Sequence, residues 1–338
     1  MSEGQEVASA PSGIALEGDS VVVVSPVHVT EACFLVPAVR ALGNARPDLQ
    51  LVILSPESFA SLWDSLPGVR TVVTYPDAAS SRQIAKIVQD SECYPDSALL
   101  WEHSEAAVAL AKVKVNQRIG YDLKPLTKRL TATVELEQSP GPIEHRVRYY
   151  VNLVERLGIE GYVASSFATP PLPPRPSLVR IGLVPGSIHG PSYQWGVDRF
   201  FELGKTLLAR HQVELVTLAY PGQAREANEL DRLFEGTVKN FANEFDLGGL
   251  LGALPHCSFL VANDGAVMHL AAHVGLPTVA LFGAGDPVAA RPLGRQHTVL
   301  SEYAACSPCH QEQCPLDHHR CMGDLSVARV YEAVRRLL

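Results

Sequence analysis

Residues 261–287, VANDGAVMHLAAHVGLPTVALFGAGDP, predict one complete β-α-β unit. The apolar run that ends at Val261 is typical of a parallel strand buried on both faces. Asn-Asp-Gly at 263–265 breaks the strand, and apolar residues return at helical spacing over 268–274. Gly275 and Pro277 then end the helix. A second buried strand over 278–282 and a Gly-rich loop complete the unit, which therefore places an Asp-Gly turn at the start of a helix.

This turn is a candidate anion site. The free backbone N–H groups and the positive end of the helix dipole at a helix N-terminus favour a bound phosphate. Asp264 also fits a simpler role, because aspartate is among the best N-cap residues. His269, one turn into the same helix, fits either a ligand contact or a buried core histidine whose hydrogen bonds are satisfied. These residues alone leave both alternatives open.

The block NDGAVMHLAAHVGLPTVALFG at 263–283 resembles the signature of glycosyltransferase family 9, the ADP-heptose:lipopolysaccharide heptosyltransferases. That family usually shows Asn-Asp-Thr-Gly-Pro-Met-His-Leu-Ala-Ala, followed by Gly-x-Pro and a strand that ends in Leu-Phe-Gly. This chain has Gly-Ala-Val at 265–267, so it lacks the threonine hydroxyl but keeps the backbone donors. The resemblance implies nucleotide-sugar contacts at Asp264, Gly265, Ala266, Met268 and His269.

The composition indicates a folded protein with a large core. The chain has 338 residues, of which 46% are hydrophobic and 19% charged, enough for two domains of ordinary size. A formal charge of −8 argues against nucleic-acid binding. We find no apolar run of membrane-spanning length and no signal peptide, so we expect a cytoplasmic protein. Its seven cysteines are then expected to be thiols or metal ligands rather than disulfides.

Strand and helix signals alternate in both halves of the chain, which predicts doubly wound α/β domains with mostly parallel sheets. Residues 1–19 are small and polar and predict a flexible tail. Five prolines within residues 169–176 predict a stiff connector. We therefore predict two domains, over 20–168 and 177–338. The resemblance implies that the N-terminal domain binds the acceptor and that the C-terminal domain binds the nucleotide sugar.

The resemblance extends into the first domain. Heptosyltransferases begin with a strand, a loop that ends in Gly-Asp and a helix with proline six residues after the aspartate. Pro37 keeps this frame, with Thr30 and Glu31 in the places of the glycine and the aspartate. The family's aspartate is its proposed general base, so the resemblance implies that Glu31 is catalytic. Without it, Glu31 is simply a glutamate that the dipole favours in a first helical turn. NQRIGY at 116–121 also resembles the family's Arg-Ile-Gly strand and turn.

Two substitutions stand out in the second domain, which otherwise resembles the family's nucleotide-binding domain from Pro-Gly-Ser at 185–187 onward. The family commonly shows Lys-x-Trp-Pro, whereas this chain has Gln194-Trp195-Gly196. A lysine near a diphosphate supplies positive charge that glutamine lacks, and Arg199 or Lys205 are candidates to compensate. The glutamate of the Gly-rich turn is replaced by Gln223, with Glu226 nearby. The resemblance implies nucleotide-sugar contacts at Ser187, Gln194, Gln223 and Glu226.

Four cysteines near the C-terminus have the spacing C-x2-C-x4-C-x6-C: Cys306, Cys309, Cys314 and Cys321. Four thiolates can surround a tetrahedral zinc ion at roughly 2.3 Å, and such a closed set leaves no open position for catalysis. We therefore predict a structural zinc and no catalytic cofactor. Free or paired thiols are the alternative.

The resemblance as a whole implies the GT-B fold, with two facing Rossmann-like domains, and a terminal helix at 326–338 that packs across the cleft. The implied activity is inverting transfer of a heptose or related sugar from a nucleotide diphosphate to a lipopolysaccharide core or lipid-linked acceptor at the inner membrane face, with peripheral association. The base takes the acceptor proton, and the diphosphate leaves into helix-mouth N–H groups. Two alternatives are a nucleotide-sugar-binding module that has lost catalysis and a sugar-nucleotide epimerase of the same fold.

Overall fold

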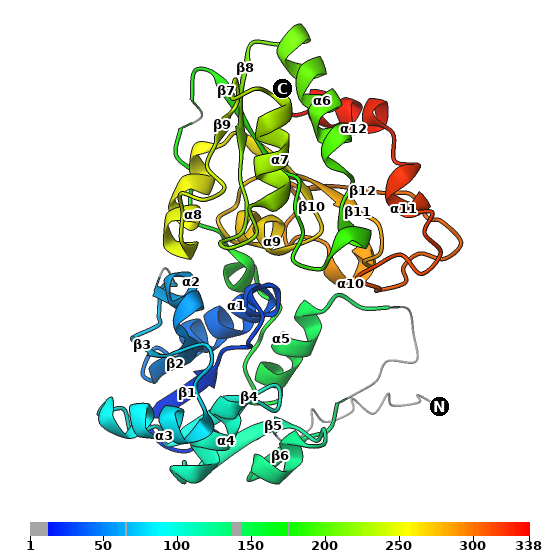
Figure 1. Cartoon of the computed structure of the whole chain (residues 1–338). Helices are drawn as coiled ribbons and strands as arrows, with labels where there is room; N and C mark the ends of the chain where they lie inside the picture. Colours follow the sequence, from blue (N-terminus) through cyan, green and yellow to red (C-terminus); the bar gives the residue numbers. More distant parts are fainter. Residues whose placement is uncertain (1–12, 65, 137–142, 175) are drawn as a thin grey trace, which may run out of the picture. The chain divides into compact units, whose positions relative to one another are not determined.

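The computed structural model describes residues 13–64, 66–136, 143–174 and 176–338, which form two compact units (Figure 1). The first unit contains residues 13–27, 35–136 and 147–166. The second contains residues 28–34, a short stretch ending at Arg146, and the chain from Phe167 onward.

The expected tail and connector both make contacts in the structure. Residues 1–12 lie outside the described residues. After them, the backbone N–H of Ile14 donates to the carbonyl oxygen of Arg156 at 2.8 Å, and that of Glu17 donates to the Gln117 side chain at 3.0 Å. The proline-rich stretch is grouped with the second unit, where Thr169 lies against Gly275.

The first unit is built on a six-stranded parallel sheet in the order β3-β2-β1-β4-β5-β6. All five residues of β1 are buried, because helices cover both faces of such a sheet. The strands are β1 (Ser20–Val24), β2 (Gln50–Pro56), β3 (Thr71–Tyr75), β4 (Ser97–Leu100), β5 (Gln117–Tyr121) and β6 (Ala132–Val134).

Helices alternate with these strands. They are α1 (Val29–Ala45), α2 (Ala60–Asp64), α3 (Ser81–Asp90), α4 (Glu105–Lys112) and α5 (Val147–Glu155). The first residues of α1, up to Phe34, are grouped with the second unit, so this helix belongs to both. Helix α5 begins at Val147, directly after the stretch ending at Arg146 that belongs to the second unit.

The second unit repeats the topology of the first, with the strand order β12-β11-β10-β7-β8-β9 and parallel pairing throughout. This is the Rossmann order, and its direction reverses between β7 and β10. Ligands of such sheets bind beyond the carboxyl ends of the strands at this reversal. The strands are β7 (Val179–Val184), β8 (Val213–Thr217), β9 (Lys239–Asn240), β10 (Phe259–Asn263), β11 (Thr278–Phe282) and β12 (Thr298–Ser301).

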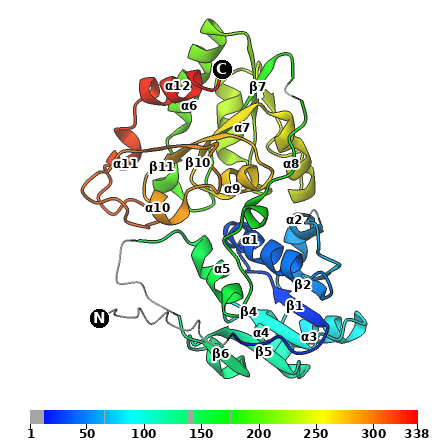
Figure 2. The same ribbon diagram turned by 180° about the vertical axis from the view of Figure 1, so that it is seen from behind.

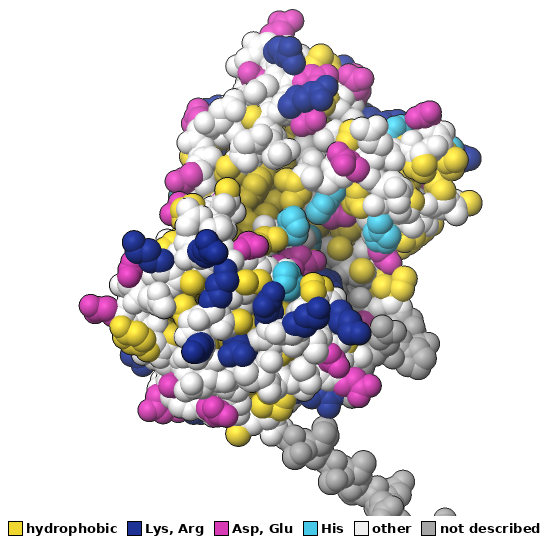
Figure 3. Space-filling model, turned by 60° about the horizontal axis from the view of Figure 1, so that its bottom comes forward, with side chains coloured by type: hydrophobic (Ala, Val, Ile, Leu, Met, Phe, Trp, Pro, Cys, Tyr) yellow, Lys and Arg dark blue, Asp and Glu magenta, His cyan; other side chains and the backbone are white. Residues whose placement is uncertain are grey.

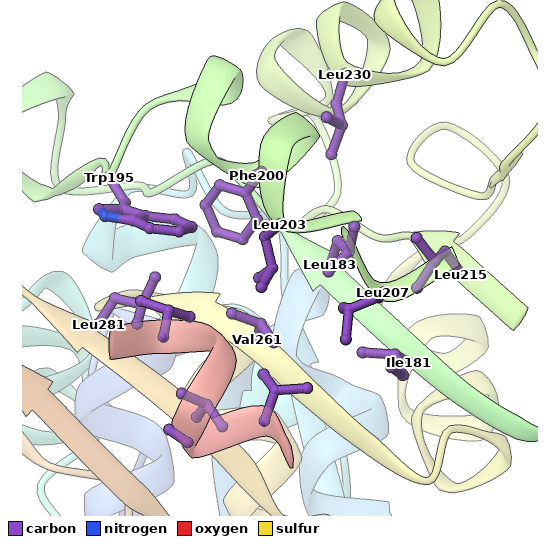
Figure 4. Packing of buried hydrophobic residues seen from close by; sticks show 14 of the residues in the cluster. Ile181, Leu183, Trp195, Phe200, Leu203, Leu207, Leu215, Leu230, Val261 and Leu281 are labelled. Atoms are coloured by element: carbon purple, nitrogen blue, oxygen red, sulfur yellow. The ribbon is translucent and has the colours of Figure 1, made fainter. Parts of the chain in front are cut away.

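The core of the second unit lies between this sheet and helix α6. Figure 4 shows Trp195, Phe200 and Leu203 on the helix side and Val261 and Leu281 on the strands, all part of one buried cluster. The helices of this unit are α6 (Val197–Arg210), α7 (Arg225–Leu233), α8 (Leu247–Ala253), α9 (Ala266–His273), α10 (Pro287–Ala290), α11 (Arg320–Gly323) and α12 (Val327–Arg335).

The C-terminal helix α12 packs within its own unit. It contacts α6 and β11, and it lies beside α6 in both ribbon views (Figures 1 and 2). Val330 and Val334, four residues apart on one helix face, are fully buried in the cluster described above. Burial of this apolar stripe against α6 explains the position of the helix.

The surface in Figure 3 carries Lys and Arg as well as Asp and Glu side chains, with hydrophobic side chains scattered between them. None of the helices formed by the described residues is long and apolar enough to cross a membrane.

Candidate functional site

Asn263, at the end of β10, joins the two loops that begin at the reversal of the second sheet. Its side-chain amide donates to the carbonyl oxygen of Pro185 at 2.6 Å, and its oxygen accepts the backbone N–H of Trp195 at 3.0 Å. Asn263 is 1% exposed, so it satisfies two backbone groups that water does not reach. In the sequence it looked only like a strand breaker. The available signal was an asparagine at the end of a buried strand.

Ser187 and Gly265 bring the other side of these loops together. The Ser187 hydroxyl donates to the carbonyl oxygen of Asp264 at 2.6 Å and accepts the backbone N–H of His189 at 3.2 Å. A Cβ atom at position 265 would lie 3.3 Å from the Ser187 oxygen. The close approach of the two loops therefore favours glycine where the family usually has threonine.

A pocket opens between these loops, and we call it the β7–β10 pocket. Four of the predicted contact residues line it: Ser187, Gln223, Gly265 and Ala266. Glu226, in the first turn of α7, stands beside it, because its carboxylate would lie 3.3 Å from a Cβ atom at Gly186. The other lining residues are Val184, Gly186, Ile188, Ala219, Tyr220, Asn263 and Val267. The pocket thus meets the N-terminus of α9, as the sequence predicts for an anion site.

Asp264 is buried beside the pocket. It is 3% exposed, and burial raises the pKa of its carboxyl group to about 7. The carboxyl lies so close to Gly285 that any side chain at position 285 would collide with it. The N-cap residue of α9 is Gly265, and the helix receives no hydrogen bond from a side-chain cap. The alternative that Asp264 simply caps this helix is therefore wrong.

His269 is buried but not satisfied. Its side chain is 2% exposed, and its Nε2 atom has no hydrogen-bond partner among the described residues. Burial, together with the nearby His145, His189 and His297, lowers its pKa to about 3, so the ring is neutral at neutral pH. Its ring meets Phe34 edge to face, with centroids 4.8 Å apart. The missing hydrogen bond contradicts the alternative of a satisfied core histidine. Leaving a buried nitrogen unpaired costs about 1–3 kcal/mol.

Glu31 belongs to the second unit although its helix continues into the first. Its carboxylate forms an ion pair with Arg146 at 2.9 Å, and the Arg146 backbone N–H donates to Ala289 at 2.8 Å. Glu31 also lies close enough to His189 to raise that histidine's pKa. The fold thus groups Glu31 with Ser187, Asp264 and His269.

Residues 172–320, which include the loops after β7, β8, β10 and β11, match the family model described as glycosyltransferase family 9 (heptosyltransferase). These residues are therefore similar to glycosyltransferase family 9. The resemblance seen in the sequence is confirmed. Over 161 residues the chain is 29% identical to lipooligosaccharide heptosyltransferase 2 of Campylobacter jejuni, and the match covers 46% of this chain and 51% of that protein. The chain thus spans about half the length of the curated relatives it matches.

Solved structures resemble nearly the whole chain in fold. E. coli ADP-heptose lipopolysaccharide heptosyltransferase II superposes with a TM-score of 0.77 at 21% identity, over 94% of this chain and 98% of that one. A family 9 glycosyltransferase from Veillonella parvula superposes with a TM-score of 0.81 at 18% identity, over 96% and 99%. At these identities the likeness concerns the fold, and the expected GT-B fold is confirmed.

The two cations that we considered as substitutes for the family 9 lysine are engaged elsewhere. The Arg199 guanidinium donates to the carbonyl oxygens of Trp195 at 2.9 Å and Gly323 at 3.0 Å. Lys205 pairs with Glu202 at 2.7 Å on the exposed face of α6. Arg199 therefore joins two backbone segments beside α6, whereas the Lys205 pair lies on the exposed surface of that helix.

Tyr193 is a site residue that the sequence analysis missed. In the family motif Lys-x-Trp-Pro, the lysine stands two residues before the tryptophan. In this chain Tyr193, and not Gln194, stands two residues before Trp195, so the motif itself could have identified Tyr193. The Tyr193 ring would lie 3.1 Å from a Cβ atom at Gly285. Burial, followed by the nearby Asp264 carboxyl and Cys309, raises its pKa to about 12. Gln194 is half-buried, and Met268 is 0% exposed, so Met268 offers no surface to a ligand in this structure.

The four C-terminal cysteines lie in one loop, which we call the cysteine loop (residues 302–319), and at the start of α11. Cys306 Sγ lies 3.9 Å from Nε2 of His318. Burial raises the pKa of Cys321, and the other three cysteines of the group raise it further. Backbone N–H groups, first that of His319, lower the pKa of Cys314. The described residues hold no group of three or more His, Cys, Asp or Glu side chains arranged for a metal ion, so the zinc stays a prediction.

The cysteine loop forms hydrogen bonds with the loops around the site. The backbone N–H of His310 donates to Ala284 at 2.9 Å, and the Glu312 carbonyl accepts the N–H of Ser192 at 3.0 Å. The Ser307 hydroxyl donates to the carbonyl oxygen of Gly283. A change in the conformation of this loop would therefore reach the residues around Asp264.

Proposed function

We propose that this protein is an inverting glycosyltransferase that moves a heptose, or a related sugar, from a nucleotide diphosphate to a hydroxyl of a lipopolysaccharide core acceptor. The observation that carries the proposal is the β7–β10 pocket, which lies at the strand reversal within the family 9 residues. The relatives named above are heptosyltransferases, and one is named for ADP-heptose. They support ADP-heptose as the donor and favour neither the binding module nor the epimerase.

In this proposal the donor diphosphate lies at the N-terminus of α9. The backbone N–H groups of Gly265 and Ala266 and the helix dipole stabilise its charge without a divalent metal. His269 Nε2 gains from the ligand the hydrogen bond that the described residues do not provide. Ser187 fixes the turn through its bond to Asp264, and Gln223 and Glu226 border the far side.

Glu31 is the general base of the proposed transfer. Its carboxylate takes the proton of the acceptor hydroxyl as that oxygen bonds to the anomeric carbon from the face opposite the leaving diphosphate. The bond from the anomeric carbon to the phosphate oxygen breaks, and the electron pair leaves with the diphosphate. The ion pair with Arg146 holds the carboxylate in position before the acceptor arrives.

Two further expectations belong to the proposal. The acceptor, lipopolysaccharide core or another lipid-linked molecule, is met at the inner membrane face by a cytoplasmic enzyme that associates peripherally. We also propose that the cysteine loop and Cys321 bind a structural zinc ion. The spacing of the four cysteines supports this, and so does the effect of the other three on the pKa of Cys321. The arrangement in the structure does not fit a metal, so binding requires the loop to rearrange.

A matched pair of glycine variants tests the donor site. Gly265→Val places a side chain at Ser187 and in the β7–β10 pocket, whereas Gly252→Val places one in α8, where a Cβ meets nothing within 4 Å. In a thermal-shift assay, ADP-heptose at 100 times its Kd should stabilise the unmutated protein by about 2.7 kcal/mol. We expect Gly252→Val to keep this stabilisation and Gly265→Val to lose it.

Two results would contradict the proposed function. Equal stabilisation of both variants would place the donor elsewhere. A protein that binds ADP-heptose but releases no ADP with any lipopolysaccharide core acceptor would favour the binding module instead.

A further inference from the structure

The β7–β10 pocket offers backbone donors to a diphosphate, but its described lining includes no fixed cation. Its lining residues within the described chain include no lysine or arginine. Arg199 and Lys205 are engaged with the α6 region, and Arg146 pairs with Glu31. Leaving groups of this charge are stabilised in enzymes by fixed cations or donors placed where the charge develops. A residue that becomes charged only with the ligand would meet this requirement.

His189 is placed to do so. Ser187 and Ile188 line the pocket, and His189 is the next residue, with its backbone N–H bonded to the Ser187 hydroxyl at 3.2 Å. Its half-buried ring packs on Tyr193, with centroids 5.1 Å apart. Glu312 of the cysteine loop lies against Gly190 and supports the turn from the other side. The imidazole is therefore held against Tyr193, on the residue that directly follows two lining residues of the pocket.

The charged and titratable groups around His189 come from several elements. His28 and Glu31 face it from the start of α1, Tyr193 from the turn before α6, and His269 from α9. Burial lowers the pKa of His189, the His28 charge lowers it further, and Glu31 opposes them. Without ligand, His189 is therefore neutral at neutral pH. A diphosphate adds negative charge beside the ring and favours its protonated form.

We propose that His189 takes up a proton from solvent when a nucleoside diphosphate binds and then donates a hydrogen bond, as an imidazolium, to the diphosphate. The inference rests on the proposed function. When the bond from the sugar to the phosphate oxygen breaks, the electron pair stays on that oxygen, and the imidazolium stabilises the new charge. This histidine thus supplies the charge that a lysine provides in the family motif.

Calorimetric titration with ADP measures the uptake directly. At pH 7.5, the binding enthalpy in buffers of different ionisation enthalpy should show uptake of up to about one proton per ADP bound, as linkage requires for one group whose pKa rises on binding. His189→Gln should abolish the uptake and weaken ADP binding by about 10–100-fold, the value of a hydrogen bond to a charged group. His211→Gln is the matched control. His211 directly follows α6, and its ring forms a hydrogen bond with Tyr331 of α12. It should behave like the unmutated protein.

Additional variants separate His189 from its neighbours and from a structural role. His189→Lys should restore affinity without uptake, because lysine is already charged; a purely structural histidine would not show this pattern. Uptake that persists in His189→Gln, or that disappears in His28→Gln or Asp264→Asn, would overturn the assignment. If the unmutated protein binds no ADP at pH 6 or 7.5, the proposed function fails, and this inference fails with it.

Discussion

Replacing the buried carboxyl group of Asp264 by an amide should stabilise the protein at alkaline pH and leave it unchanged in acid. The folded protein holds the Asp264 proton up to a pH of about 7, whereas the ordinary pKa is 3.8. The stability that this proton contributes is fully present below pH 3.8 and is lost as the pH rises to about 7. At about 1.4 kcal/mol per pH unit, the loss is at most about 4 kcal/mol. Asp264→Asn has no such proton to lose.

His269 has the opposite effect on the pH dependence of the unfolding free energy. The effect of Asp264 must therefore be measured by comparing variants. Burial depresses its pKa from 6.5 to about 3, so the stability from its neutral ring is present above pH 6.5 and is lost as the pH falls toward 3. Between about pH 4 and 6.5 the two dependences cancel, and the unmutated protein alone would show little slope. The difference in unfolding free energy between Asp264→Asn and the unmutated protein isolates Asp264.

Urea unfolding between pH 4 and 8.5, followed by tryptophan fluorescence, measures this difference, because Trp195 reports on the core of the second unit. We expect a difference near zero at pH 4 that grows to about 4 kcal/mol above pH 7. Asp198→Asn, which removes an exposed carboxyl group from the same unit, is the matched control. The reasoning would be refuted if Asp264→Asn and the unmutated protein differed in unfolding free energy by the same amount at both ends of the pH range. It would also be refuted if they did not differ at pH 8.

Three other changes have specific expected outcomes. Glu31→Gln should bind the donor normally and lose about 10²–10⁴-fold in kcat, because the general base is removed; full turnover would mean that another residue is the base. Protein purified without chelator should contain zinc at Cys306, Cys309, Cys314 and Cys321 by elemental analysis, and metal-free protein with all four thiols reactive would rule this out. Asn263→Ala should destabilise the protein by roughly 2–4 kcal/mol in urea, because two buried backbone groups lose their partner; a loss below about 0.5 kcal/mol would show that water replaces the side chain.

The strands that the sequence predicted best are the buried central ones. The apolar runs at β10 and β11 are local signals, because a parallel strand with both faces covered needs apolar residues at every position. Strands β6 and β9, with three and two residues, were not predicted. Such short edge strands form because a neighbouring strand offers hydrogen bonds, and their own residues carry little pattern.

The chemistry of Asp264 shows where local reasoning ends. An aspartate before a helix fits a cap, and the residues around Asp264 left both this role and a ligand site open. In the structure the carboxyl instead faces Gly285, which follows the next strand, and the nearby Tyr193, which follows β7. The position of the carboxyl thus depends on how three segments of the chain meet.

The sequence alone therefore established the α/β architecture, the family motif and the helix N-terminus that is expected to hold a phosphate, since all three follow from residues close together in the chain. The tertiary structure was needed to group Glu31 with His269, to show Asn263 joining two loops, and to bury Asp264 and His269. The physical reason is that desolvation and hydrogen-bond pairing depend on neighbours that are distant in sequence. No local pattern of residues specifies those neighbours.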